Sequence, residues 1–150
     1  MKRLIILSVL AMSVMACCAK KENNTAIAET ATAANKPASH FEHLKSGTQG
    51  GRERASNEVI TSQSELDGLY NELKWGEAPM VDFAQKNVVA LFMGQKSSGG
   101  YKIGIENLSV QGNKATVRIS RTSPEGMATS VMTQPYFVAA INKTDKVVFE

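Results

Sequence analysis

The chain from residue 39 to residue 150 combines one helical pattern with several strand-like patterns. Across 62–74, "SQSELDGLYNELK", apolar residues recur at steps of three and four, and Ser62 with Glu65 forms a capping box that satisfies two backbone donors. Gly68 lowers the helix propensity by about 1 kcal/mol relative to alanine, so this helix depends on tertiary packing. The segment 62–74 is therefore predicted to be a helix with one apolar stripe, formed by Leu66, Leu69, Tyr70 and Leu73.

The remaining patterns are typical of β-strands. "NVVALFM" at 87–93 is apolar on both faces, which predicts a central strand. "GYKIGIENLSV" at 100–110 alternates and changes register near Asn107, and "QGN" at 111–113 predicts a hairpin turn into "KATVRIS". Further strands are predicted at 57–60, 134–142 and 146–150, the last two joined by a short "KTD" turn, with an irregular edge strand in "HFEHLKSGTQGG".

Together these elements predict an α+β domain over residues 39–150. Its architecture would be a mostly antiparallel β-sheet with one main helix, at about 62–74, packed on a face. A length of about 110 residues is normal for a domain with a single core. The pattern does not indicate which face of the sheet the helix covers.

The N-terminus has the pattern of a bacterial secretory signal. A basic start, "MKR", precedes the apolar stretch 4–16, which is shorter than the roughly 20 residues of a spanning helix. "VMAC" at 14–17 resembles the lipobox of bacterial lipoproteins, which implies that 1–16 is a lipoprotein signal peptide and that Cys17 is lipidated with acyl chains such as palmitate. An ordinary cleaved signal peptide remains the alternative.

Residues 17–38 are predicted to be a flexible tether between this anchor and the domain. The segment is rich in Ala, Thr, Asn and Lys and has no sustained apolar period. No aspartate follows Cys17, which favours an outer-membrane anchor in the cell envelope. The only other cysteine is Cys18, so the domain has no disulfide, and the fate of Cys18 stays open.

Charge and candidate chemistry argue against nucleic-acid binding and give no clear catalytic site. Removing Lys2 and Arg3 with the signal lowers the net charge from +3 to about +1, which leaves no basic patch. His40 and His43 lack a third metal ligand, so no metal or other cofactor is predicted. The sequence therefore favours a protein that is not an enzyme, although distant carboxylates that converge in the fold would reopen that question.

The glycine-rich stretch "GQKSSGGY" at 94–101 is the most unusual segment of the domain. It lacks the order of a phosphate-binding loop and leads into a strand, and its serines have no evident histidine base. One interpretation is that it presents a tyrosine to a partner, as "TQPY" at 133–136 would. The alternative is that the tyrosines belong to the core. The candidate partner-binding residues are Ser97, Ser98, Gly99, Gly100, Tyr101, Thr133, Gln134, Pro135 and Tyr136.

The order and spacing of these segments resemble the C-terminal domain of the protease complex subunit PrcB family. The resemblance runs from about Phe41 to Glu150 and depends chiefly on "GQKSSGGYKIGI" and "SPEGMATSVMTQPYFV". It implies a membrane-anchored, non-enzymatic accessory lipoprotein that binds an exported protein, a protease or another envelope protein, through loops at 94–101 and 123–136.

Two other functions stay open at this point. The Gly-Gly-Tyr loop and "QPY" are also similar to binding loops of chagasin-like protease inhibitors, but the sequence has no "RPW", and a helix at 62–74 is foreign to that sandwich. A structural envelope lipoprotein without a protease partner is the other alternative.

Overall fold

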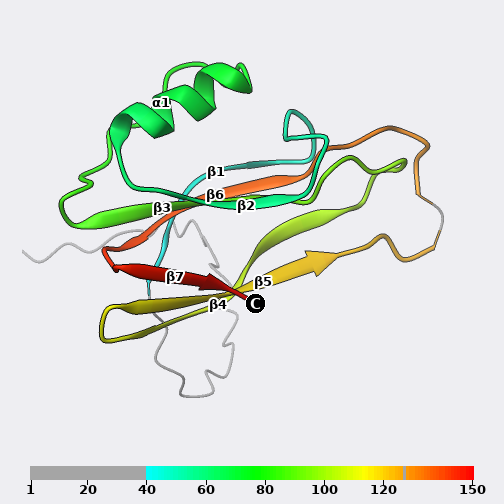
Figure 1. The fold of residues 1–150 in the computed structure, drawn as a ribbon. Helices are drawn as coiled ribbons and strands as arrows, with labels where there is room; N and C mark the ends of the chain where they lie inside the picture. The colour runs from blue at the N-terminus through cyan, green and yellow to red at the C-terminus, as the bar shows by residue number, and fades with distance from the viewer. Residues whose placement is uncertain (1–39, 127) are drawn as a thin grey trace, which may run out of the picture. The chain divides into compact units, whose positions relative to one another are not determined.

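The computed structural model describes residues 40–126 and 128–150, which form one helix and seven strands (Figure 1). The predicted signal peptide, Cys17 and the tether lie outside the described residues, and so does Met127. In chain order the elements are β1 Glu42–Gly47, β2 Ser56–Ile60, α1 Gln63–Glu72, β3 Lys86–Phe92, β4 Lys102–Gln111, β5 Lys114–Thr122, β6 Tyr136–Asn142 and β7 Lys146–Phe149. No helix among them has the length and apolar character needed to cross a bilayer.

The strands divide into two sheets, so the domain has three layers (Figure 1). The first sheet is antiparallel with the order β1-β6-β3-β2, and α1 packs on one of its faces. The second sheet, β4-β5-β7, covers the opposite face. The α+β class with one helix on a mostly antiparallel sheet is confirmed.

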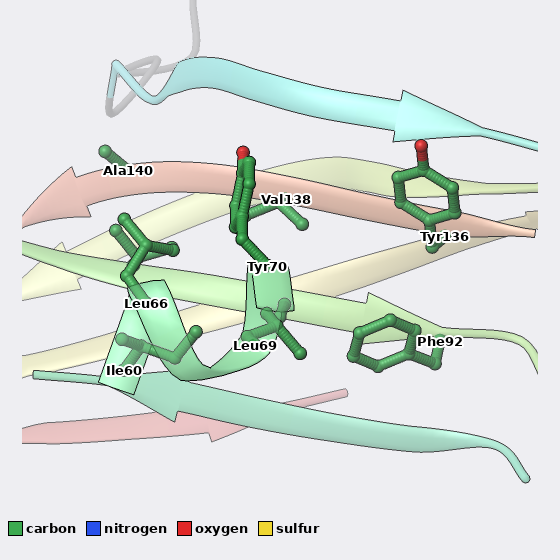
Figure 2. Close-up of a cluster of buried hydrophobic side chains, with 10 residues drawn as sticks. Ile60, Leu66, Leu69, Tyr70, Phe92, Tyr136, Val138 and Ala140 are labelled. Carbon is green, nitrogen blue, oxygen red and sulfur yellow. The ribbon is translucent and has the colours of Figure 1, made fainter. Parts of the chain in front are cut away.

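β3 is buried on both faces because it lies between the helix and the second sheet. Val88 and Phe92 point toward α1, while Val89 and Leu91 belong to the core between the sheets. On the helix side, Leu66, Leu69 and Tyr70 descend onto β3 and β6, as Figure 2 shows. The predicted central position of 87–93 is therefore confirmed, since two apolar faces require a cover on each side.

The helix begins one residue after its predicted capping residue. The Ser62 hydroxyl accepts a hydrogen bond from the Glu65 backbone N–H at 3.3 Å. The Glu65 carboxylate accepts from the backbone N–H of Thr61 at 2.8 Å, one residue earlier than the standard capping box requires. Two donors are satisfied as predicted, but the second belongs to Thr61.

The β4–β5 hairpin has the predicted turn and the predicted change of register. Gln111 pairs with Lys114, which leaves a two-residue turn in which Gly112 has a φ of 55°. The ladder shifts between Ile105 and Asn107, so β4 carries a bulge. β1 is likewise an irregular edge strand, with a bulge between His43 and Lys45.

The last strand differs from the sequence expectation that 146–150 completes the same sheet as 134–142. β7 does not form a hairpin with β6 but pairs in parallel with β5 in the second sheet. Within the "KTD" connection, the N–H of Lys143 bonds the carbonyl of Gln85 at 2.8 Å, whereas the N–H of Asp145 bonds the carbonyl of Asn113 at 3.0 Å. The connection therefore carries the chain from one sheet to the other instead of turning it back.

Candidate partner-binding surface

Three segments meet where β3 ends and β6 begins, and we call this surface the loop end: residues 48–55, 94–101 and 123–136 without 127 (Figure 1). The two predicted binding loops are joined by an isolated bridge between Lys96 and Thr133. Each backbone N–H of that pair donates to the carbonyl of the other, at 2.8 and 2.9 Å. The two loops thus share one end of the first sheet.

Further hydrogen bonds make the two loops a single unit. The Thr133 hydroxyl donates to the Ser98 carbonyl at 2.9 Å, and the Gly99 N–H donates to the Thr129 carbonyl at 3.0 Å. Gly100 has a φ of +89°, and a Cβ there would lie 2.7 Å from the Cβ of Pro124. Only glycine fits at this position, because the backbone angle and the close approach both exclude a side chain.

The third segment is attached to both loops through its backbone. The Gln134 N–H donates to the Thr48 carbonyl at 2.9 Å, and the Gly51 N–H donates to the Gln134 carbonyl at 3.1 Å. Gln95 is tied to the same segment, because its N–H donates to the Glu53 carbonyl at 2.9 Å. The three segments of the loop end are therefore held together by backbone hydrogen bonds between them, outside regular helices and strands.

Arg52 fixes this third segment to the helix. Its guanidinium makes two parallel bonds to the Glu72 carboxylate, at 3.0 and 2.9 Å, and also contacts Glu58. Burial lowers the pKa of Arg52, but the bonds to both carboxylates outweigh it and the pKa is raised, so the side chain stays charged. The guanidinium also lies 5.0 Å from the centre of the Phe92 ring.

Tyr136 and its neighbours support the loop end from inside. Tyr136 is the first residue of β6, is 6% exposed, and stacks on Trp75 with ring centres 4.2 Å apart. Burial raises the pKa of Tyr136 above its ordinary value. Thr133 and Pro135 are buried as well. These three side chains are therefore not available for direct contact with a partner, because β6 enters the core at its first residue.

Tyr101 is intermediate between the two interpretations of the sequence. Its ring is half-buried and packs against the core cluster of Leu91, Ile103 and Ile119. The Lys96 Nζ lies 5.6 Å from its centre, on the surface. Ser97 is exposed, while Ser98, Gly99 and Gln134 are half-buried. Gly100 is exposed. The predicted loop residues thus include both surface and supporting positions.

Two exposed apolar residues lie within the predicted binding loop 123–136, although neither was among the individually named candidates. Val131 is 46% exposed and Met132 is 67% exposed, and the Met132 sulfur lies 3.0 Å from Nε2 of Gln95. The available signal was weak: an apolar pair flanked by polar residues in "TSVMTQ" at 129–134. Contiguous patches of exposed apolar side chains mark contact sites for other proteins, whereas single exposed apolar residues are ordinary on a protein surface.

The described residues offer little for catalysis or metal binding. Across 40–126 and 128–150, no group of three or more His, Cys, Asp or Glu side chains is placed to hold a metal ion. His43 lies on β1, where its Nε2 is 2.9 Å from the Ser46 hydroxyl, and His40 is exposed.

The comparison with known families concerns the part of the chain that contains both joined loops. Residues 87–142 match the family model of the PrcB C-terminal domain. The match identifies this segment with the PrcB family and confirms the resemblance over that range. It spans β3 to β6 and both joined loops. No curated protein and no solved structure matches the chain.

Proposed function

We propose that this protein is a membrane-anchored, non-enzymatic accessory lipoprotein that binds an exported protease through the loop end. A PrcB-family domain is consistent with an accessory subunit of a protease complex. The observation that carries the proposal is the pair of hydrogen-bonded loops, which present Val131 and Met132 to solvent at one end of the sheet. Lipidation at Cys17 would place the domain at the outer membrane of the cell envelope.

The loop end has the composition of a small protein-binding surface. Val131 and Met132 supply an apolar centre, and the side chains of Gln95, Lys96 and Ser97 supply hydrogen-bonding groups around it. The Lys96–Thr133 bridge and the Thr133–Ser98 bond hold the loops in one arrangement before a partner arrives. Less conformational entropy is then lost on binding, which favours affinity.

The test is a capture experiment with the full chain, purified in detergent with its anchor. Envelope proteins are captured, and any protease recovered is assayed with and without the protein. Met132→Asp is the test variant, because it places a charge at the apolar centre of the loop end. Met80→Asp is the matched control: Met80 is 88% exposed and follows Pro79, whose carbonyl bonds Gln63 at the other end of the domain.

The proposal expects a captured protease whose activity depends on this protein. Met132→Asp should weaken capture by about tenfold or more, with an unchanged melting temperature, while Met80→Asp should bind normally. Cys17→Ala should move the protein from the membrane to the soluble fraction without weakening capture. Suppressed protease activity would instead indicate an inhibitor. Failure to capture any protease, or equal capture by Met132→Asp, would reject the binding role.

A further inference from the structure

A groove lined mainly by apolar side chains runs between the edge strands β1 and β4. It consists of two adjoining hollows of about 440 and 330 Å³, which share Lys102, Ile103 and Phe137. Phe41 and Ile105 line the larger one. Phe41 meets Phe137 edge-on at 6.1 Å, so the wall of the groove is aromatic. The lining residues place both hollows between the first sheet, at Phe137, and the second sheet, at Lys102 and Ile103.

Both borders of the groove are edge strands, but they are not equivalent. Among the described strands, β1 pairs only with β6, and β4 pairs only with β5. β1 is bulged between His43 and Lys45, and the Lys45 ammonium lies 5.9 Å from the rings of Tyr70 and Trp75. Bulges and lysines protect edges from pairing. β4 also carries a lysine, Lys102, and a bulge between Ile105 and Asn107, but its four residues Lys102 to Ile105 keep a regular register, so this stretch is the border able to accept another strand.

Gly104 lies in this regular part of β4, and the fold does not require a glycine there. A Cβ at Gly104 would meet only ring carbons of Phe137, at 3.9 and 4.0 Å, and the residue has no positive φ. Glycine within a strand weakens it and often marks a place where another backbone or a ligand approaches closely. Neither the backbone angle nor the packing requires a glycine at position 104. The missing side chain leaves room in the larger hollow, which Gly104 lines.

The charge of the groove restricts its occupant. Lys102 lines both hollows, and no carboxylate residue lines either of them. Lys102 is exposed and belongs to no ion pair in the described part of the chain. An occupant with apolar side chains and one carboxylate would match both the walls and this cation.

We infer that the groove binds an extended acidic segment of a partner protein, which adds as a strand to β4 at Lys102–Ile105. Alternate side chains of that segment enter the apolar groove, its backbone pairs with the free edge of β4, and its carboxylate meets Lys102. This goes beyond the proposed function. The groove uses Lys102 and Gly104, whereas the loop end uses Val131 and Met132, so failure of one binding activity leaves the other measurable.

The probe is a fluorescein-labelled peptide that alternates threonine and valine, with glutamate in place of its central valine, because Lys102 and Gly104 are two residues apart and share one face of β4. A second peptide carries lysine in place of that glutamate, and a third has N-methyl groups on alternate backbone nitrogens, which block strand pairing. Fluorescence anisotropy measures their binding to the full chain in detergent. Hydrogen exchange locates protected amides, with the exchange of 102–106 compared with that of 42–47.

Three results are expected. The glutamate peptide binds at least about tenfold more tightly than the lysine or N-methyl peptide, and it protects 102–106 rather than 42–47. Gly104→Leu fills the groove, weakens binding about tenfold and leaves the melting temperature near that of the native protein. Lys102→Glu reverses the preference between glutamate and lysine peptides, whereas Lys114→Glu, an exposed lysine beside the hairpin turn, does not.

Several outcomes would overturn the inference. One is a glutamate peptide with a Kd above about 1 mM. Others are undiminished binding by Gly104→Leu, an unchanged charge preference in Lys102→Glu, or protection at 42–47, which would place the strand on β1. If Gly104→Leu fails to fold, Gly104→Ala and Lys102→Glu still decide the question, because a Cβ at 104 meets only ordinary contacts.

Discussion

Two glycines of this domain place opposite demands on an added methyl group. Gly68 lies on the exposed face of α1, and a Cβ there would meet nothing within 4 Å. Gly100 has a positive φ and lies against Pro124. Gly68→Ala should therefore raise the free energy of unfolding by about 1 kcal/mol, and Gly100→Ala should lower it by at least about 1 kcal/mol. Urea denaturation of both variants measures the difference, and two changes of the same sign would contradict this account of Gly100.

The Glu65 carboxylate makes the stability of the helix start depend on pH. The hydrogen bond from the Thr61 N–H is the largest cause that lowers the pKa of Glu65. Because the pKa is lower in the folded state, the stabilisation is present above the ordinary glutamate pKa of 4.5 and is lost as the pH falls through the folded-state pKa. Glu65→Gln should therefore lower the melting temperature at neutral pH and have little effect in strong acid.

Ser62→Ala provides the control for this pH dependence. The Ser62 hydroxyl does not titrate and is the smallest of the causes that lower the pKa of Glu65, so most of the roughly 1 kcal/mol lost in Ser62→Ala should remain lost at acidic pH. Melting curves of both variants over the acid range separate the two contributions. A Glu65→Gln effect that persists undiminished in strong acid would show that the charge of Glu65 is not what stabilises the cap.

Residues with local roles were predictable from the sequence, and residues whose roles depend on distant contacts were not. Ser62 and Glu65 act within one turn of helix, so their spacing predicts their hydrogen bonds closely. Tyr136 was a candidate contact residue because it follows a proline in a loop-like stretch. Its burial depends on Trp75, which is far away in the sequence and stacks on it only in the folded domain.

At the scale of elements, the Thr133 hydroxyl is the side-chain link between the two loops. Thr133→Val keeps the shape of the buried side chain but leaves the Ser98 carbonyl without this partner. We expect stability to fall by about 1 kcal/mol, and the Gly99 amide, which donates to Thr129, to exchange faster with solvent. Thr133→Ser retains the hydroxyl and should preserve the slow exchange. Equal exchange in both variants would show that the backbone bridge alone joins the loops.

The positions of the helix and strands were largely predictable from the sequence. Which strands pair with each other was predictable only for strands that are neighbours in the sequence. The turn at 111–113 fixes the β4–β5 register, because a two-residue turn permits one pairing. The Lys96–Thr133 bridge joins residues far apart in the sequence. The sequence therefore could not predict whether the two loops lie side by side. The same limit applies to β7: the sequence predicted a strand at 146–150 but not its parallel pairing with β5.

At the scale of the whole molecule, the first sheet is shared by two cores. Alternate residues of β3 face α1 and the second sheet, so neighbouring positions belong to different layers. The sequence predicted one sheet with one covered face, and the apolar character of 87–93 on both faces was the sign of a second cover. The second face is covered by a separate sheet of β4, β5 and β7. The association of these three strands into their own sheet cannot be predicted from local sequence patterns.

Because both cores share β3 and β6, the three layers should unfold together. Leu66 is buried on the helix side and Leu108 in the core between the sheets, so Leu66→Ala and Leu108→Ala remove the same atoms from opposite faces. Each should cost about 2–5 kcal/mol. Trp75, the single tryptophan, packs against the helix-side core and reports on it by fluorescence, while far-ultraviolet circular dichroism reports on both sheets. In a cooperative domain, Leu108→Ala shifts the two signals to the same midpoint, although Leu108 belongs to the other core. A fluorescence midpoint that stays at its native value while the dichroism midpoint falls would mean that the second sheet unfolds separately from the helix-covered sheet.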